Sequence, residues 1–239
     1  MRILARDLYE YDLDEKKKQS LTYVDRYFYR PIANKMVPFL FNVLKLSPNA
    51  ISILSLIASV IGFVLIISDF VYGIYFGMMF LMLWAVLDCA DGSLARVLLF
   101  KYQIKNPLGE FFDAFAGYCV IAGLWFSLGW AAFYDSGNIR IFFIGSLSAI
   151  FGLLSRVSYN KLSLVKIKNG ILEDSDSRQS LLYCIYENLE FGSLLFPLIL
   201  VATYLQLLPE IILIYFLINL MMFLWLCRKV MMDSREFHE

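Results

Sequence analysis

Six apolar runs, each close to the length that crosses a bilayer, constrain this chain more than any other feature of its sequence. A bilayer core about 30 Å thick needs roughly 20 apolar residues per helical span. Runs of this kind lie at approximately 50–68, 71–87, 111–134, 141–158, 191–207 and 210–227. With 60% hydrophobic residues, the chain is too apolar for a soluble domain of 239 residues. The sequence therefore predicts an all-α integral membrane protein with six transmembrane helices.

The distribution of basic residues predicts the orientation of these spans. Six spans place both termini on the same side of the membrane. Of the 21 basic residues, 20 fall on that side and only Arg140 falls on the other. Because Lys and Arg favour cytoplasmic loops, we expect both termini in the cytoplasm. The opening segment lacks the apolar core of a cleaved signal peptide, so the first span is expected to act as an uncleaved insertion signal.

The residues before the first span have a composition of their own. Residues 1–19 are expected to form a polar cytoplasmic tail. Residues 20–46 mix aromatic and basic side chains, which is typical of an amphipathic helix lying in the membrane interface. Pro31 and Pro38 are expected to break or bend that helix. The predicted organisation is a tail and juxtamembrane helix over 1–46, a six-helix membrane domain over 47–228, which would hold any functional site, and a C-terminal cytoplasmic tail over 229–239.

Two glycines of the second span, the four cysteines and the single histidine each carry a further expectation. Gly73 and Gly77 stand four apart in the second span, a spacing that lets helices approach closely, and packing inside one bundle is favoured over a dimer contact. The four cysteines are scattered, so neither a disulfide nor a zinc site is expected. His238 is the single histidine and lies beside the C-terminus, which leaves no histidine for a catalytic triad or a proton relay within the spans.

Carboxylates gather where the second and third spans approach the cytoplasm. They are Asp88, Asp91, Glu110 and Asp113. Carboxylates at the edge of a membrane span are costly, and they are functional candidates for that reason. Asp88 and Asp91 are three residues apart on one helix and face the same way, so their charges repel unless a cation or proton lies between them.

We expect Asp88, Asp91 and Asp113 to ligate a divalent metal. Their ligand atoms are hard oxygens, which favours Mg²⁺, Mn²⁺ or Ca²⁺. Gly92 leaves room for a ligand or backbone to come close, and the forked cation of Arg96 suits a phosphate or one of these carboxylates. The structural alternative is that the acidic residues merely pair with Arg96, Lys101 and Lys105 at the interface.

Two segments resemble the signature of the CDP-alcohol phosphotransferases, D(x)2DG(x)2AR(x)8-9G(x)3D(x)3D. The segments are DCADGSLAR, from Asp88 to Arg96, and PLGEFFDAFAG, from Pro107 to Gly117. The matching residues are Asp88, Asp91, Gly92, Ala95, Arg96, Gly109 and Asp113. A weaker similarity covers Arg30 to Ser52, which looks like the juxtamembrane helix and Pro-Asn turn of family members that use inositol phosphates.

The resemblance implies a reaction. Family members bind a CDP-linked donor, hold two divalent metals with the motif aspartates, and transfer the substituted phosphate to an acceptor hydroxyl while CMP leaves. Here it implies Mg²⁺ or Mn²⁺ as cofactor, with nucleotide and phosphate contacts from Gly92, Ala95, Arg96 and Asn49. It also implies a small-molecule or lipid donor, an alcohol or phosphorylated acceptor, contact with membrane lipid and a homodimer. No nucleic-acid partner is expected.

The sequence departs from the signature at two places. Twelve residues separate Arg96 from Gly109, where the signature has eight or nine. The fourth aspartate, which is a metal ligand and general base in the family, would fall at position 117, where this chain has glycine. Glu110, three residues before Asp113, is the nearest replacement in sequence. An acceptor that is already ionised would need no base, and a pseudoenzyme is the third alternative.

The acceptor site is less constrained by the sequence. Arg156 ends the fourth span near the cytoplasmic face, and it is either a phosphate anchor for the acceptor or a snorkelling interface residue. The family resemblance favours the anchor. The competing class of function is a non-enzymatic membrane protein, such as a pseudoenzyme scaffold or a divalent-cation carrier on the same fold.

Overall fold

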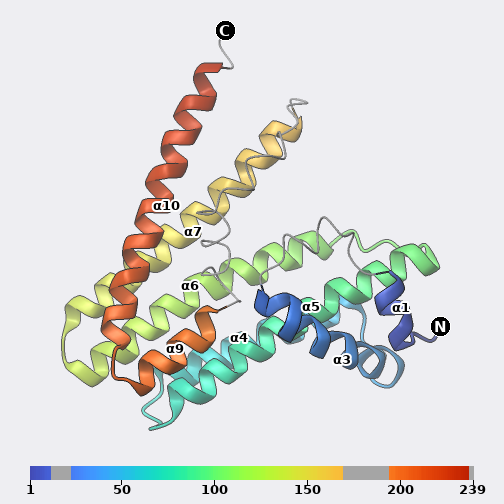
Figure 1. The fold of residues 1–239 in the computed structure, drawn as a ribbon, viewed down its shortest axis with the longest axis horizontal. Helices are drawn as coiled ribbons and strands as arrows, with labels where there is room; N and C mark the ends of the chain where they lie inside the picture. Colours follow the sequence, from blue (N-terminus) through green and yellow to red (C-terminus); the bar gives the residue numbers. More distant parts are fainter. Residues whose placement is uncertain (12–22, 169–193, 237–239) are drawn as a thin grey trace.

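The structure, a computed structural model, describes residues 1–11, 23–168 and 194–236. Within these residues all regular secondary structure is helical (Figure 1). A short helix, a π-helical turn and a medium helix precede the long helices: α1 (Ala5–Glu10), η1 (Asp25–Tyr29) and α3 (Arg30–Asn42). The remaining helices are α4 (Pro48–Ile67), α5 (Gly73–Tyr102), α6 (Gly109–Ser136), α7 (Ile139–Lys168), α9 (Leu195–Tyr204) and α10 (Leu208–Glu236).

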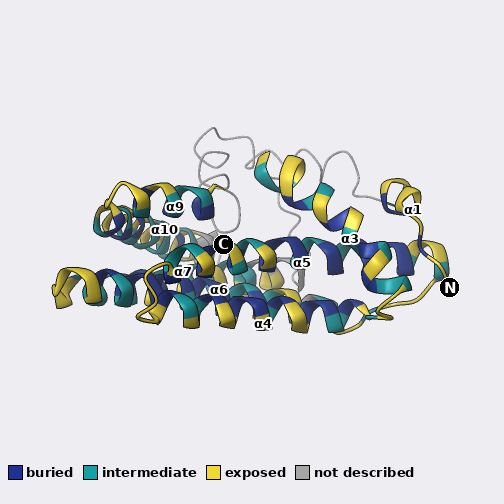
Figure 2. Ribbon diagram, turned by 90° about the horizontal axis from the view of Figure 1, so that it is seen from below, coloured by how far each residue is buried: buried dark blue, intermediate teal, exposed yellow. Residues whose placement is uncertain are grey.

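Among the described residues, five helices contain stretches long and apolar enough to cross a membrane. These stretches are Pro48–Ile67, Gly73–Tyr102, Phe111–Ser136, Ile139–Leu162 and Leu208–Met232. Large apolar side chains lie exposed along them, for example Ile57, Val60 and Val64 on α4. Figure 2 shows such exposed stripes running the length of the long helices. An apolar surface of this extent needs lipid as its solvent, and the chain is therefore a multi-pass α-helical membrane protein.

The described residues do not confirm the sixth predicted span. The apolar run predicted over 191–207 coincides with α9, whose ten residues, Leu195–Tyr204, span only about 15 Å at 1.5 Å per residue. The residues before position 194, including Cys184 and most of the long predicted loop, lie outside the described part of the chain. The helices that contain the second and fourth predicted spans extend past the predicted ends at 87 and 158, because α5 continues to Tyr102 and α7 to Lys168.

Close backbone contact joins α4 to α5. A Cβ placed on Gly77 would lie 2.6 Å from the carbonyl oxygen of Gly62 and 2.5 Å from Cγ1 of Ile66. A Cβ on Gly73 would lie 2.3 Å from the carbonyl oxygen of Leu65. Both glycines therefore serve packing inside the bundle, which was the favoured interpretation of their spacing.

Of the twelve residues between Arg96 and Gly109, the first six continue helix α5 and the last six form a loop. The helix α5 runs on through residues 97–102 and ends at Gln103, whose left-handed φ of 56° lets its backbone N–H reach the carbonyl of Leu99. The loop is then only 103–108, and α6 begins at Gly109. The motif aspartates of α5 consequently stand on regular helix rather than at a helix end.

The juxtamembrane segment passes through both prolines without breaking. The wider turn of η1 directly precedes Pro31, where the N–H of Arg30 bonds to the carbonyl of Asp25. Pro31 then occupies the first turn of α3, where no N–H is needed. Pro38 lies inside the helix, which continues to Asn42. Of the predicted break or bend, the break does not occur, and a π-turn precedes the helix that contains both prolines. The helix α3 packs against α5, which it crosses obliquely (Figure 2).

The first eleven residues are docked, although the sequence predicted a polar tail. The backbone of Ile3 exchanges two hydrogen bonds with the side chain of Asn42, at 3.0 and 2.7 Å. Asp7, buried at the start of α1, forms a 2.7 Å ion pair with Lys101 at the end of α5. Lys101 therefore pairs with the N-terminal helix and not with the motif aspartates.

Candidate functional site

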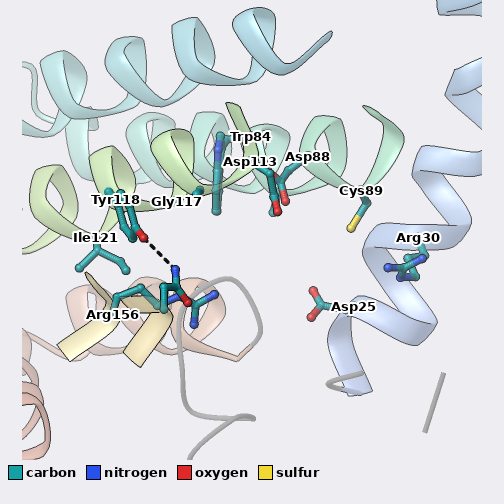
Figure 3. A pocket seen from close by; sticks show the side chains of 13 residues that line it. Asp25, Arg30, Trp84, Asp88, Cys89, Asp113, Gly117, Tyr118, Ile121 and Arg156 are labelled. Carbon is teal, nitrogen blue, oxygen red and sulfur yellow. Dashed lines mark hydrogen bonds between the residues drawn. The ribbon is translucent and has the colours of Figure 1, made fainter. Parts of the chain in front are cut away.

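A cavity of about 370 Å³ lies where α5, α6 and α7 meet the N-terminal segment η1–α3. Its volume falls in the range of small-molecule sites. Figure 3 shows its lining side chains, with Asp88 and Asp113 on one wall, Arg156 below them, and Asp25 and Arg30 on the opposite side. The full lining is Asp25, Arg30, Trp84, Ala85, Asp88, Cys89, Asp113, Ala114, Gly117, Tyr118, Ile121, Arg156 and Asn160.

The structure brings two of the three predicted metal ligands into this cavity. Asp88 of α5 is half-buried and Asp113 of α6 is exposed, and both line the same space. Asp88 lies within electrostatic reach of Asp91 and Asp113, so the three carboxylates repel one another. Arg156 of α7 partly offsets this negative charge.

The third predicted ligand, Asp91, faces α4. It is 8% exposed and is absent from the cavity lining. The hydroxyl of Ser52 donates a short hydrogen bond to Oδ2 of Asp91 and also contacts the carbonyl of Pro48, at 3.1 Å. A hydroxyl donor that holds one oxygen of a carboxylate is the usual second layer of a metal site, since it fixes the orientation of the ligand.

The donor set fits a hard divalent cation. All three side chains supply carboxylate oxygen, and their mutual repulsion is what a cation would relieve. In the described part of the chain, no three His, Cys, Asp or Glu side chains converge closely enough to hold one ion. Asp88, Asp91 and Asp113 would therefore have to draw together around the metal.

The predicted phosphate-binding residues stand on the last turns of α5 and the first turn of α4. Arg96 donates a 3.0 Å hydrogen bond from Nη2 to Oγ of Ser93. A Cβ on Gly92 would lie 3.4 Å from Nη1 of Arg96, so the glycine leaves room beside this guanidinium. Ala95 and Asn49 are half-buried, and Asn49 lies one turn before Ser52 on α4.

Gly117 opens directly onto the cavity. A Cβ built at this position would meet nothing within 4 Å. The space that the family's fourth aspartate would occupy is thus part of the cavity, continuous with Asp113 one turn before it. Glu110 lies in the first turn of α6, but its side chain falls outside the described residues.

The sequence analysis missed polar groups of the cavity where α6 and α7 meet. Asn160 donates a 2.8 Å hydrogen bond from Nδ2 to the hydroxyl of Tyr118, which ties α7 to α6 beside Arg156 (Figure 3). Two sequence signals pointed here: Tyr118 follows Gly117 directly, and Asn160 lies four residues after Arg156, on the same helix face. Asp25, Ser52 and Trp84 carried no comparable signal.

Comparison with known families agrees with this geometry. The model of the CDP-alcohol phosphatidyltransferase family matches residues 45–168, which contain α4 to α7 and every motif residue named above. Members of that family generally depend on divalent metal ions. A search of curated proteins found no match to the chain. Because the family match covers more than half of the sequence, the protein belongs to the CDP-alcohol phosphatidyltransferase family.

Proposed function

We propose that the protein transfers a substituted phosphate from a CDP-linked donor to an acceptor hydroxyl or phosphate, releasing CMP, in the synthesis of membrane phospholipid or of a surface glycopolymer. One observation carries the proposal: two motif aspartates, Asp88 and Asp113, share a cavity of small-molecule size with Arg156. An acidic wall facing an arginine suits a metal-bound phosphate on one side and an anionic acceptor on the other.

In this proposal Asp88, Asp91 and Asp113 hold Mg²⁺ or Mn²⁺, as one or two ions. The bound metal would neutralise charge on the attacked phosphate and on the departing CMP. Ser52 holds Asp91 in place. The nucleotide phosphates lie near Gly92, Ala95 and Arg96, where the missing side chain of Gly92 leaves room beside a forked donor. Asn49 contacts the nucleotide from α4.

The acceptor occupies the space below Gly117, between α6 and α7. Arg156 binds its anionic group, and the linked pair Tyr118 and Asn160 limits its size. For an acceptor that attacks through an ionised phosphate oxygen, no base is required; for an alcohol, the first-turn carboxylate of Glu110 is the candidate derived from sequence. We further propose that the termini and the site are cytoplasmic, in the cell membrane, and that the protein is a homodimer.

The decisive experiment is a screen of the purified protein for metal-dependent CMP release. CDP-linked lipids and small CDP-alcohols are each offered with polyols, sugar phosphates and inositol phosphates, with Mg²⁺ or with a chelator. We expect at least one pair to release CMP only with the metal, and Asp91→Asn to abolish that release. Asp135→Asn, an exposed aspartate at the opposite end of α6, serves as the matched control and should keep full activity.

A binding measurement complements the screen. CDP with Mg²⁺ should raise the melting temperature through ligand linkage, by an amount that grows with CDP concentration. The proposed donor site is wrong if neither CDP nor any other nucleotide shifts the melting temperature at millimolar concentration.

A further inference from the structure

One carboxylate of the cavity belongs neither to the family motif nor to the proposed metal site. Asp25 lines the same space as Asp88, Asp113 and Gly117. In Figure 3 it points into the cavity from η1, facing the wall formed by α5 and α6. It comes from a segment about ninety residues before Asp113 in sequence, which is why the motif spacing gave no sign of it.

The local fold fixes where Asp25 stands. It is the first residue of the π-helical turn η1, whose last residue, Tyr29, is fully buried. A π-turn is wider than an α-turn and is found frequently at functional sites, because it changes the direction of the side chains that precede it. Burial and the nearby charge of Asp25 raise the pKa of Tyr29, so this buried side chain stays neutral where it packs beneath the turn.

The charge of Asp25 acts across the cavity. It interacts electrostatically with the side chains of Asp88 and Cys89, both on the facing helix α5. Asp25 is itself half-buried, and the space between it and α6 is the cavity that remains open at Gly117. A molecule filling that space would touch α6 on one side and Asp25 on the other.

We propose that Asp25 is the general base of the transfer reaction and replaces the carboxylate that is absent at position 117. The inference rests on the proposed function and concerns an alcohol acceptor. Asp25 takes the proton of the acceptor hydroxyl as that oxygen forms its bond to the donor phosphorus. The bond from this phosphorus to the oxygen of CMP breaks, and CMP leaves with the bonding electron pair. The proton remains on Asp25 until it passes to solvent.

The assignment also describes the acceptor. Its anionic group lies at Arg156, and its reacting hydroxyl lies between the metal aspartates and Asp25. This arrangement selects a polyol or sugar bearing a phosphate, with a free hydroxyl separated from that phosphate by part of a ring or chain. An acceptor without the anionic group would lose the contact with Arg156 and keep the contact with Asp25.

The competing role for Asp25 is structural, as an acidic partner that holds η1 against Arg30. A structural role predicts that its loss disturbs donor binding and stability together with turnover. A base predicts loss of turnover alone. Chemical rescue distinguishes them further, since a small carboxylic acid can enter the space left by a truncated aspartate and accept the proton, but it cannot rebuild a helix contact.

The test compares Asp25→Asn, Asp25→Ala, Glu110→Gln and the control Asp69→Asn, an exposed aspartate after the far end of α4. Turnover is measured as CMP release with the donor and acceptor pair found in the screen, and donor binding as the melting shift with CDP and Mg²⁺. We expect Asp25→Asn to lower kcat by at least ~100-fold, as loss of a general base does, with the CDP shift and the donor KM changed less than about twofold. Formate or acetate should restore Asp25→Ala by about tenfold or more, while Asp69→Asn keeps full activity.

The outcomes that overturn the inference differ from those that overturn the proposed function. Full turnover in Asp25→Asn, or a CDP shift lost together with turnover, removes Asp25 as the base while the transferase function stands. A large loss in Glu110→Gln with none in Asp25→Asn assigns the base to Glu110. A wild-type protein that binds no nucleotide and releases no CMP overturns the proposed function itself, and the role of Asp25 with it.

Discussion

Ser52 on α4 donates a hydrogen bond to Oδ2 of Asp91 on α5, and both side chains are buried. This contact joins the helix that carries the Pro-Asn turn to the helix that carries most of the family motif. It fixes how the carboxylate of Asp91 is turned. The contact thus couples the packing of α4 on α5 to the geometry of the proposed metal site.

Replacing Ser52 by alanine should therefore weaken metal-dependent nucleotide binding. Loss of a hydrogen bond that orients a ligand typically costs ~10- to 100-fold in metal affinity, and we expect about tenfold here. The measurement is the Mg²⁺ concentration needed for half of the CDP-induced melting shift.

Ser55→Ala is the matched control for Ser52→Ala. Ser55 is also buried on α4, but its hydroxyl donates to a backbone carbonyl, that of Ser52, at 2.7 Å. Both variants lose a buried hydroxyl, so an equal effect in the two would show that the contact with Asp91 does not matter to binding.

The ion pair between Asp7 and Lys101 should make stability depend on pH. The backbone N–H of Leu4 and the ammonium of Lys101 both hold the pKa of Asp7 below its ordinary value. A lowered folded pKa stabilises the protein above the unfolded pKa of about 3.9, and the stabilisation is lost as the pH falls through the folded pKa. Asp7→Asn should lower the melting temperature by ~2–4 °C at pH 7, as for roughly 1 kcal/mol.

The same variant should show a smaller deficit near pH 3, because that pH lies below the unfolded pKa of about 3.9, where the stabilisation by the lowered folded pKa is being lost. Glu10→Gln, an exposed residue of the same short helix, controls for the loss of one negative charge. A deficit that does not change between pH 7 and pH 3 would mean that Asp7 acts through packing and not through its charge.

The membrane class and the motif helices could be predicted because their signals are local. Apolar runs of span length marked α4 to α7, and the ordered spacing from Asp88 to Asp113 marked the wall of the cavity. The contact between Ser52 and Asp91 was beyond such reasoning, because it links residues 39 apart whose proximity depends on how α4 packs on α5.

The N-terminal segment shows the same limit more clearly. A polar sequence predicts a tail when its partners are unknown, yet Asp7 and the backbone of Ile3 find theirs in Lys101 and Asn42. Asp25 likewise looked like one charge among interface aromatics, and only the tertiary fold places it in the cavity. Span boundaries also failed where a helix continues past its apolar run, as α5 does from Asp88 to Tyr102.

Gly77, like Gly73, should not accept a side chain at the α4–α5 contact. Alanine at position 77 would place a Cβ 2.6 Å from the carbonyl of Gly62, where backbone must move. Overpacking of this kind typically costs about 1–3 kcal/mol. We expect Gly77→Ala to lower the melting temperature of the detergent-solubilised protein by several degrees, whereas Gly117→Ala, which meets nothing within 4 Å, should leave it unchanged. Equal melting temperatures for the two variants would contradict the close approach of α4 and α5.

Gly117→Asp restores the family signature, and we expect it to lower activity. The new side chain meets no neighbour at its Cβ, so the variant should fold and melt as the wild type does. Its carboxylate would fill space assigned to the acceptor and add negative charge beside Asp113. The acceptor KM should rise by roughly tenfold, the order of discrimination that a small change in pocket shape produces, with the CDP-induced melting shift retained.

Gly117→Ala adds bulk without charge and should have a smaller effect. If Gly117→Asp instead raises a weak wild-type activity, the space is not an acceptor site and the protein is an enzyme that lost its base. A fall in the activity of Gly117→Asp therefore indicates a working site in which glycine makes room for the acceptor, and a rise indicates an enzyme that has lost its general base.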